Sequence, residues 1–285
     1  MPECGFNSGF EFSNRTMPNV KTNHPIALIT GASSGIGEEL AKCFAEAGHD
    51  LVLVARSADK LKALAADLIR THGVKAWVEP ADLSQLGAAD ALALRLKRQR
   101  RSIHVLVNCA GVLYHGPFTH QSSDTAQSMI DLNISGLTAM LNAFLPDMVA
   151  RGAGRVMNVA SIASFQPVPS LATYAATKAY VLSLTEALSE EIKGSGVTIT
   201  ALCPGVTATN MLSQAAAADP TLAKLPGVLV GEAAEVAMQG FKACMRGQVI
   251  CVPGVANQAT VLASRSTPKW LVRKLGGWLG RLQAK

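Results

Sequence analysis

The chain has 285 residues, of which 49% are hydrophobic and 16% are charged, and its formal net charge is +6. This composition supplies a hydrophobic core and excludes an intrinsically disordered chain, and the longest apolar runs are shorter than the ~20 residues of a membrane-spanning helix. The whole positive excess lies in residues 265–285, so the rest of the chain shows no bias toward nucleic-acid binding.

Apolar segments of strand length alternate along the chain with segments of helix length. The predicted strands are, in order, 26–30, 51–55, 74–79, 104–108, 155–160, 197–203 and 248–252. Helices are predicted after the first strand to about His49, over about 59–72 with Gly73 as C-cap, over 84–101, over 124–151, and over the segment that carries Tyr174. The strands are continuously apolar, which is typical of a parallel sheet covered by helices on both faces. We therefore predict a single doubly wound α/β domain over 25–255, with a seven-stranded, mostly parallel sheet.

Residues 1–24 contain no basic segment followed by an apolar one, so they do not resemble a secretory signal, and we expect a flexible N-terminal extension. The six cysteines are scattered, without a Cys-x-x-Cys pair or the spacing of a metal site. Most of them lie within apolar patterns, where a thiol behaves as a small hydrophobic group. We therefore predict no metal site and a reduced, cytoplasmic protein rather than a disulfide scaffold.

The segment TGASSGIG follows the first predicted strand and opens the first helix. Its glycines permit a tight turn and a close approach of the backbone, and N–H groups at such a helix start bind a pyrophosphate. Because a strand precedes the turn and a helix follows it, we interpret it as a dinucleotide site of the Rossmann type rather than a structural turn. The residues expected at the phosphates are Gly31, Ser33, Ser34, Gly35, Ile36 and Gly37.

The end of the second predicted strand bears on the choice between NAD and NADP. An acidic residue there bonds the ribose 2′-hydroxyl of NAD, whereas an arginine accommodates the 2′-phosphate of NADP. The strand ends in Ala55, Arg56 and Ser57 without a carboxylate, and a guanidinium pairs with phosphate in a forked geometry. We predict NADP(H), with Arg56 at the phosphate; the alternative is a solvated surface arginine. Asp82, after the third strand, either caps the next helix or bonds the adenine.

Six motifs, in order between about residues 25 and 255, resemble those of the short-chain dehydrogenase/reductase family. They are the TGASSGIG turn, Asn108-Cys109-Ala110-Gly111 with Cys in place of the family's second Asn, Asn133 in DLNISG, Ser161 in NVASIAS, Tyr174 and Lys178 in YAATK, and PGVTAT from Pro204 to Thr209. The interval of 13 residues from Ser161 to Tyr174 is the family's usual one. The resemblance implies a catalytic set of Asn133, Ser161, Tyr174 and Lys178. It also implies cofactor contacts from Asp82, Leu83, Asn108, Ala110, Gly111, Tyr174, Lys178, Pro204, Gly205, Val206, Thr207 and Thr209.

Tyr174 and Lys178 are four residues apart, so a helix places them on one face, a turn apart. A phenol has an ordinary pKa of about 10, and a nearby ammonium lowers it, so we predict that Lys178 lowers the pKa of Tyr174. The predicted reaction transfers a hydride between NADP(H) and a carbonyl or secondary alcohol, with Tyr174 as acid and Ser161 bonding the same oxygen. The resemblance gives Asn133 a water that links Lys178 to solvent. The alternative is a non-catalytic nucleotide-binding regulatory or scaffold protein.

The predicted substrate loops, 162–173 and 207–227, are rich in apolar residues and nearly without charge. They favour an apolar small-molecule substrate, such as a ketone or a 3-oxoacyl or steroid-like compound, and the second loop is interpreted as a mobile lid. The family resemblance also implies a homodimer or homotetramer, assembled through helix 124–151 and the Tyr174 helix.

The C-terminal tail, 256–285, differs from the rest of the chain because it is basic. Within it, residues 269–283 place Trp and Leu side chains on one side of a helical wheel and Lys and Arg side chains on the other. Such a segment either docks on protein, whether the same chain or a partner subunit, or contacts a membrane surface. The expected localisation is accordingly cytoplasmic, and peripheral at a membrane if the tail binds lipid.

Overall fold

The computed structural model describes residues 24–209, 212–213 and 230–266. The predicted N-terminal extension apart from His24, the predicted amphipathic segment 269–283, and most of the predicted lid at 207–227 lie outside the described residues. Among the described residues, no helix is long and apolar enough to cross a membrane.

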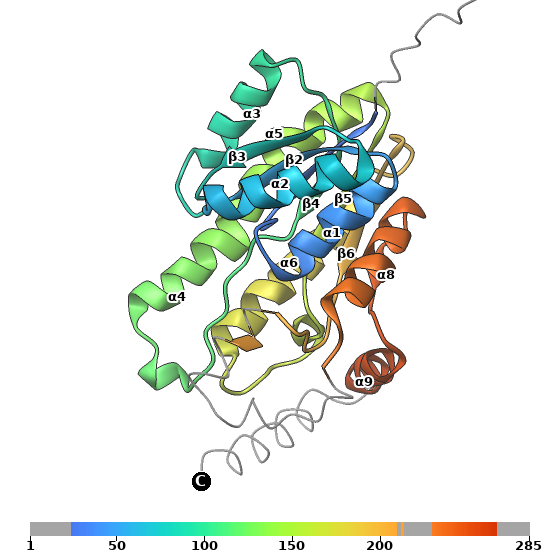
Figure 1. Ribbon diagram of the computed structural model, residues 1–285. Helices are drawn as coiled ribbons and strands as arrows, with labels where there is room; N and C mark the ends of the chain where they lie inside the picture. Colours follow the sequence, from blue (N-terminus) through green and yellow to red (C-terminus); the bar gives the residue numbers. More distant parts are fainter. Residues whose placement is uncertain (1–23, 210–211, 214–229, 267–285) are drawn as a thin grey trace, which may run out of the picture.

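Seven parallel strands form one sheet in the order β3-β2-β1-β4-β5-β6-β7 (Figure 1). The strands are β1 (Ile26–Thr30), β2 (Asp50–Ala55), β3 (Ala76–Pro80), β4 (Ile103–Asn108), β5 (Gly154–Val159), β6 (Val197–Leu202) and β7 (Ile250–Cys251). The strand order reverses between β1 and β4, which are neighbours in the sheet but far apart in the chain. In such sheets the crevice at the carboxyl ends of the two strands binds ligands.

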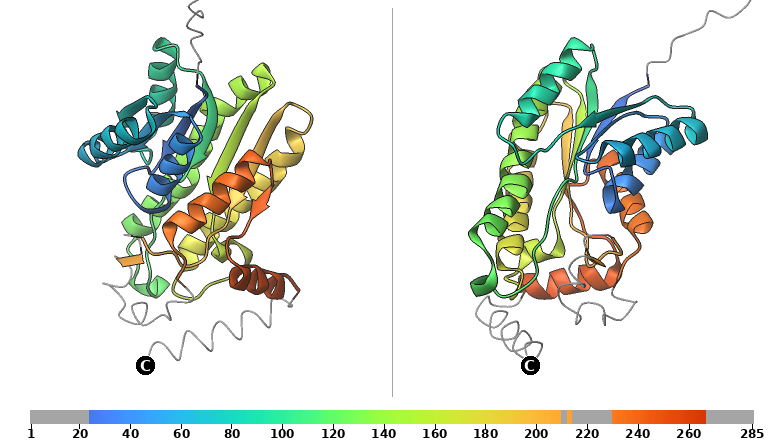
Figure 2. Two further views of the ribbon diagram at one scale, coloured as in Figure 1. Left: turned by 45° about the vertical axis from the view of Figure 1, so that its right-hand side comes forward. Right: turned by 60° about the vertical axis from the view of Figure 1, so that its left-hand side comes forward.

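Helices cover both faces of the sheet, as Figure 2 shows with the sheet seen edge-on. They are α1 (Gly35–Glu46), α2 (Ala58–His72), α3 (Ala88–Arg98), α4 (Ser123–Ile130), α5 (Leu137–Arg151), α6 (Ala172–Glu191), α8 (Ala233–Met245) and α9 (Val255–Ser266). One buried cluster joins α1, α2 and α8 to one face of the sheet, and a second joins α3, α5 and α6 to the other. The predicted doubly wound fold is confirmed.

The ends of several helices differ from the prediction. Helix α3 begins at Ala88 rather than at Ser84, because the Asp82 carboxylate accepts hydrogen bonds from the Ser84 N–H (3.1 Å) and hydroxyl (2.7 Å). Asp82 therefore does not cap α3, and Gly87 is its N-cap residue. The predicted C-cap of α2 is confirmed, since Gly73 has a left-handed φ of 68° and its N–H bonds the carbonyl of Ile69.

Two features of the fold near the candidate site were not predicted from the pattern. The long helix predicted over 124–151 is divided into α4 and α5 by a π-helical segment, η2 (Asp131–Gly136). Helix α9 begins at the predicted boundary between the domain and the tail, and it packs against η3 (Ile162–Phe165), a short 3-10 helix that directly follows β5 and Ser161. The first part of the predicted tail is thus a helix beside the candidate active site.

Candidate active site

Ser161 and Tyr174 meet at the carboxyl end of β5. Ser161 is the N-cap of η3, where its hydroxyl accepts the Ala163 N–H at 3.1 Å. Ser164 ties η3 to α6, because its hydroxyl donates to the Lys178 carbonyl at 2.8 Å. Tyr174 lies in the first turn of α6, and the hydrogen bond of Ser161 to its phenol favours the ionised form of Tyr174. The two hydroxyls that the sequence pointed to are therefore brought together.

Burial, and not Lys178, decides the pKa of Tyr174. It raises this pKa to about 12, against the smaller opposing effect of the Ser161 hydrogen bond. The predicted lowering by Lys178 is therefore wrong for the chain as described. Burial lowers the pKa of Lys178 itself to about 8, its Nζ lies 5.7 Å from the centre of the Tyr174 ring, and it donates to the Val159 carbonyl at 2.8 Å. At neutral pH the phenol is thus protonated and most of the lysine is charged.

Asn133 holds the loop after β4 against α6. Its Oδ1 accepts the Val112 N–H at 2.9 Å, and its Nδ2 donates to the Val112 carbonyl at 2.9 Å and to the Thr177 hydroxyl at 3.1 Å. The side chain is 1% exposed. A Cβ built on Gly111 would lie 3.2 Å from Asn133 Oδ1 and 3.5 Å from Lys178 Nζ, so both groups border the same point of the crevice. The predicted water relay through Asn133 stays a prediction.

The π-helical segment η2 explains how Asn133 reaches this position. A Cβ on Gly136 would lie 2.4 Å from the Leu83 carbonyl oxygen, so only glycine allows the segment to approach the chain after β3 so closely. Single-turn π segments occur often at functional sites. The motif DLNISG therefore carries both the functional side chain and the glycine that positions it.

The glycine-rich turn lies against the segment that follows β4. Gly31 has a left-handed φ of 68°, and a Cβ there would lie 2.9 Å from the backbone of Ala110. The Thr30 hydroxyl accepts the N–H groups of Cys109 and Ala110, both at 3.0 Å, and this joins the ends of β1 and β4. At the start of α1, the side chain of the N-cap Ser34 makes no capping hydrogen bond. A helix start whose backbone N–H groups are not capped by the side chain of its N-cap residue fits a dinucleotide pyrophosphate.

Two of the other predicted cofactor residues lie beside the turn or at the end of a neighbouring strand, and a third is turned away from the crevice. Arg56 is exposed at the end of β2, and its charge contributes to the lowered pKa of Asp82, after the larger effect of the Ser84 hydroxyl. Thr209 lies beside the turn, since a Cβ on Gly35 would be 2.9 Å from its methyl group. Asn108 is the third: its Nδ2 donates to Asn158 Oδ1 at 3.0 Å, inside the sheet.

The segment after β6 is held in place by backbone contacts. The Ile162 N–H donates to the Pro204 carbonyl at 2.9 Å, and the Gly231 N–H donates to the Val206 carbonyl at 2.9 Å. Thr207 pairs with Gly231 in an isolated bridge. On the side of α9, a Cβ on Gly205 would lie 2.5 Å from Asn257 Oδ1. Asn257 was not identified from the sequence, because an Asn in a surface helix carries no signal of its own.

Side chains that support the site also went unidentified. Asn158 in β5 accepts from Asn108 and donates to the Thr185 hydroxyl in α6 at 2.9 Å, all within the buried sheet–helix layer. An Asn in the middle of an apolar strand was the available signal, since buried polar groups require partners. Among the described residues, no group of three His, Cys, Asp or Glu side chains is arranged to hold a metal ion.

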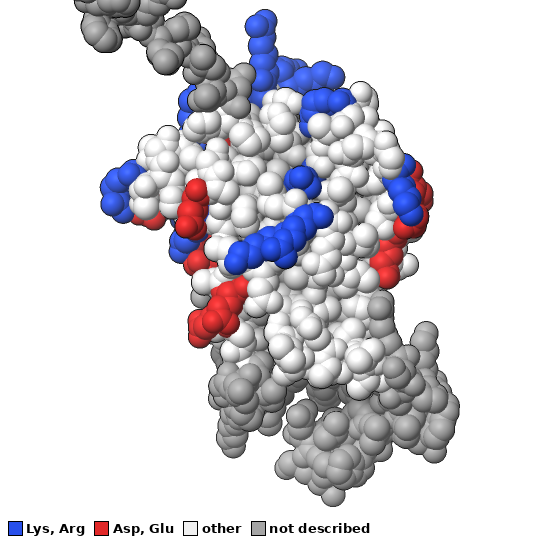
Figure 3. All heavy atoms as spheres, turned by 90° about the vertical axis from the view of Figure 1, so that its right-hand side faces the viewer, with Lys and Arg blue, Asp and Glu red and all other residues white. Residues whose placement is uncertain are grey.

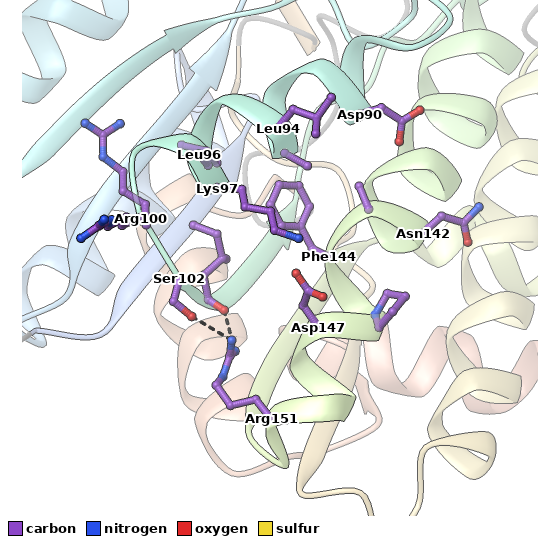
Figure 4. Close-up of a pocket in the computed structure, with 15 residues that line it drawn as sticks. Asp90, Leu94, Leu96, Lys97, Arg100, Ser102, Asn142, Phe144, Asp147 and Arg151 are labelled. Carbon is purple, nitrogen blue, oxygen red and sulfur yellow. Dashed lines mark hydrogen bonds between the residues drawn. The ribbon is translucent and has the colours of Figure 1, made fainter.

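A cavity of about 630 Å³ lies between α3 and α5, which cover one face of the sheet (Figure 4). Leu94 and Phe144 contribute apolar walls, and Lys97 and Asp147 point toward one another across it. Arg151 lies at the end near β4. None of the predicted site residues lines this cavity, so it is separate from the crevice described above.

Residues 25–220 match the family model described as short chain dehydrogenase. The chain belongs to the short-chain dehydrogenase family. An uncharacterised oxidoreductase of Staphylococcus haemolyticus is 38% identical to this short-chain dehydrogenase over 189 residues, covering 66% of this chain and 80% of that protein. These matches support an oxidoreductase that acts on CH–OH or C=O groups.

Two solved structures of the family bear on the cofactor. A short-chain dehydrogenase from Sphingobium yanoikuyae in complex with NADPH is 36% identical, with a TM-score of 0.76 over 85% of this chain and 93% of that one. A short chain dehydrogenase/reductase from Burkholderia phymatum in complex with NAD is 28% identical, with a TM-score of 0.75 over 84% of this chain and 92% of that one. The family thus binds either dinucleotide on this fold.

Proposed function

We propose that this chain is an NADP(H)-dependent oxidoreductase that interconverts an apolar ketone and its secondary alcohol. The observation that supports the proposal is the convergence of Asn133, Ser161, Tyr174 and Lys178 at the carboxyl ends of β4 and β5. A non-catalytic scaffold is the weaker alternative, because a buried ammonium costs folding free energy that only a function repays. Lys178 is 5% exposed.

When bound, NADP(H) supplies or accepts the hydride at the carbonyl carbon. In reduction, the protonated phenol of Tyr174 gives its proton to the oxygen on which negative charge develops. The Ser161 hydroxyl, oriented by its place at the start of η3, donates a hydrogen bond to the same oxygen. The ammonium of Lys178 stabilises the phenolate left behind, and Asn133 with its water returns a proton from solvent. Oxidation of the alcohol runs through the same groups in reverse.

The proposed cofactor contacts divide into three groups of residues. The turn from Gly31 to Gly37 receives the pyrophosphate, Arg56 with Ser33 and Ser57 receives the 2′-phosphate, and the residues from Pro204 to Thr209 orient the nicotinamide end. The absence of an acidic residue at the end of β2 supports NADP(H) over NAD(H). The Asp82 carboxylate is bonded by Ser84, and the charge of Arg56 contributes to the lowered pKa of Asp82, so Arg56 offers a positive charge near this strand end for the ribose phosphate.

The side chains near Tyr174 support an apolar substrate. Tyr174, Met129, Ala163 and Ala175 form a small buried cluster, against which Val112, Leu113, Tyr114, Val168 and Leu171 pack. A wall of this kind binds the hydrocarbon part of a ketone and leaves its oxygen to the two hydroxyls. We further propose a cytoplasmic homo-oligomer, assembled through α4, α5 and α6.

Tyr174→Phe tests the catalytic part of the proposal. The assay is the oxidation of NADPH in the presence of a panel of apolar ketones. The wild type should turn over one or more of them, and Tyr174→Phe should lower kcat about 10²- to 10⁴-fold, the usual contribution of a general acid. Tyr180→Phe is the matched control, since Tyr180 lies on the same helix, is 37% exposed and has its hydroxyl 2.9 Å from the Thr138 hydroxyl. Full activity in Tyr174→Phe would refute the assigned acid.

Arg56→Ala tests the cofactor preference. The loss of a charge-assisted pair with phosphate should raise the KM for NADPH about 10- to 100-fold and leave the KM for NADH nearly unchanged. Arg70→Ala, which removes an exposed arginine paired with Asp67 on α2, should change neither value. A wild type that prefers NADH would overturn the assignment of Arg56.

A further inference from the structure

We propose that the end of the molecule that carries the active site docks on an anionic lipid bilayer through the exposed side of α9. The exposed side of α9 is apolar to an unusual degree: Val255 is 82% exposed and Leu262 is 68% exposed. The two lie seven residues apart, on one side of the helix, while Val261 is buried against the body.

Before Arg265 in its last turn, helix α9 also lacks the charges that a solvent-facing helix normally carries. No residue from Val255 to Ser264 is charged. The exposed side of α2, by contrast, carries Asp59, Lys60 and Asp67. An exposed helix with two large apolar side chains and no charge over its first ten residues is better suited to an apolar partner than to water.

The surroundings of α9 have the same character. In Figure 1, α9 and the start of α4 both lie at the lower end of the molecule. Phe118, in the 3-10 helix η1 (Phe118–His120) just before α4, is 66% exposed, and Val206, after β6, is 37% exposed. On the face seen in Figure 3, the charged side chains lie above this end, and the described atoms of the lower end belong to uncharged residues.

The sequence that continues from α9 identifies the partner as an anionic lipid surface. Residues 265–285 contain six Lys and Arg and no acidic residue, together with Trp270 and Trp278. Basic residues near an anionic bilayer are attracted to it, and Trp and Leu insert at the interface. Docking on the adjoining body would require several acidic partners, whereas α9 and η1 contain none and the first turn of α4 contains one, Asp124. Docking between two subunits is the competing arrangement, and the truncated chain described below tests it.

The position of α9 ties this surface to the active site. It packs on η3, directly after Ser161, and Asn257 fills the space beside Gly205 and donates to the Pro253 carbonyl at 2.7 Å. A bilayer in contact with α9 therefore lies close to the crevice. If the proposed function is right, an apolar ketone reaches the site from the membrane; the docking itself does not depend on that function.

The experiment is co-sedimentation of the full-length protein with vesicles of phosphatidylcholine alone or with added phosphatidylserine. The wild type should bind the phosphatidylserine vesicles, and more weakly as salt is added. The double variant Val255→Ser with Leu262→Ser should reduce partitioning at least about tenfold, because two large apolar side chains no longer leave water. Leu94→Ser, with a side chain 56% exposed on α3, is the matched control and should bind as the wild type does.

A chain truncated after residue 264 separates lipid binding from docking on protein. We expect it to lose vesicle binding while its oligomeric state, measured by size-exclusion chromatography with light scattering, stays unchanged. Equal vesicle binding by the truncated and full-length chains would overturn the proposal, and so would a truncation that changes only the oligomeric state. Tyr174→Phe should bind vesicles as the wild type does, so that failure of the proposed function and failure of docking are told apart.

Discussion

At the end of the sheet where the strands begin (the amino edge), polar side chains hydrogen-bond to neighbouring segments of the chain. At the end where the strands finish (the carboxyl edge), several polar side chains are buried at a cost in folding free energy. Arg151, beside the start of β4, donates to the Ser102 hydroxyl and the carbonyls of Ile103 and Ala153. Lys178, at the carboxyl edge, is buried, donates to the Val159 carbonyl, and has its pKa lowered to about 8 by burial. The first arrangement serves stability, and the second gives up stability to keep a charge beside a phenol.

Lys178→Met gives the largest effect expected from this difference. It removes the ammonium but keeps an unbranched side chain, so kcat should fall about 10³-fold, because the phenolate of Tyr174 loses its nearby cation. The melting temperature should stay the same or rise, since a buried charge is replaced by an apolar group. Steady-state kinetics and calorimetry give the two readouts. A variant that is active, or one that melts well below the wild type, would show that the lysine is structural.

The pH dependence of stability tests the same residue. Since burial lowers the folded-state pKa of Lys178 from 10.5 to about 8, the unfolded chain binds more protons between these values, and Lys178 makes stability rise with pH from about 8 to 10.5. Tyr174 acts in the opposite sense. Its pKa is raised from 10.0 to about 12, so its contribution to stability falls as the pH rises from 10.0 to about 12. We expect the free energy of unfolding of the wild type, measured by denaturation from pH 8 to 10.5, to include the rise with pH that Lys178 causes, and that of Lys178→Met to lack it. Parallel curves would contradict the buried charge.

Gly136→Ala should have an intermediate effect, which reaches the site through packing. The added Cβ would meet the Leu83 carbonyl oxygen at 2.4 Å, so η2 must shift and the bonds between Asn133 and Val112 must weaken. We expect kcat/KM to fall about tenfold and the free energy of unfolding to fall by about 1–3 kcal/mol, as for other overpacked sites. Ser135→Ala, at the exposed neighbouring position, is the control. An unchanged kcat/KM in Gly136→Ala would show that the π segment does not position Asn133.

The sequence predicted the sheet well because buried parallel strands are continuously apolar, and this signal is local. It missed α8, although its buried residues, such as Val236, Ala237, Gly240 and Cys244, recur at helical spacing. The ends of α3 depended on the side-chain bonds of Asp82, and the division of α4 from α5 depended on the contact between Gly136 and Leu83. Neither can be predicted from hydrophobic periodicity, because each depends on the contacts of a single residue.

The candidate site likewise has features that could be predicted from the sequence and features that could not. Which residues meet was predictable, since Ser161, Tyr174 and Lys178 follow from one strand end and one helix face. Their pKa values were not predictable, because the pKa of Tyr174 depends on burial, and the four-residue spacing of Tyr174 and Lys178 does not reveal burial. The role of Asn108 could not be read either: whether its amide faces the crevice or Asn158 depends on the packing of β4 against β5.

Arg151→Ala, at the amino edge, should change stability and leave catalysis alone. Its guanidinium makes two hydrogen bonds of 2.8 Å and one of 3.1 Å that join the end of α5 to the start of β4 and the turn before β5. Their loss should lower the free energy of unfolding by about 1–3 kcal/mol, measured by urea denaturation. Lys193→Ala, which removes an exposed pair with Glu190, should cost less than about 1 kcal/mol. A fall in kcat without a fall in stability for Arg151→Ala would contradict the division between the two edges, because this arginine would then act on the crevice from the far side of the sheet.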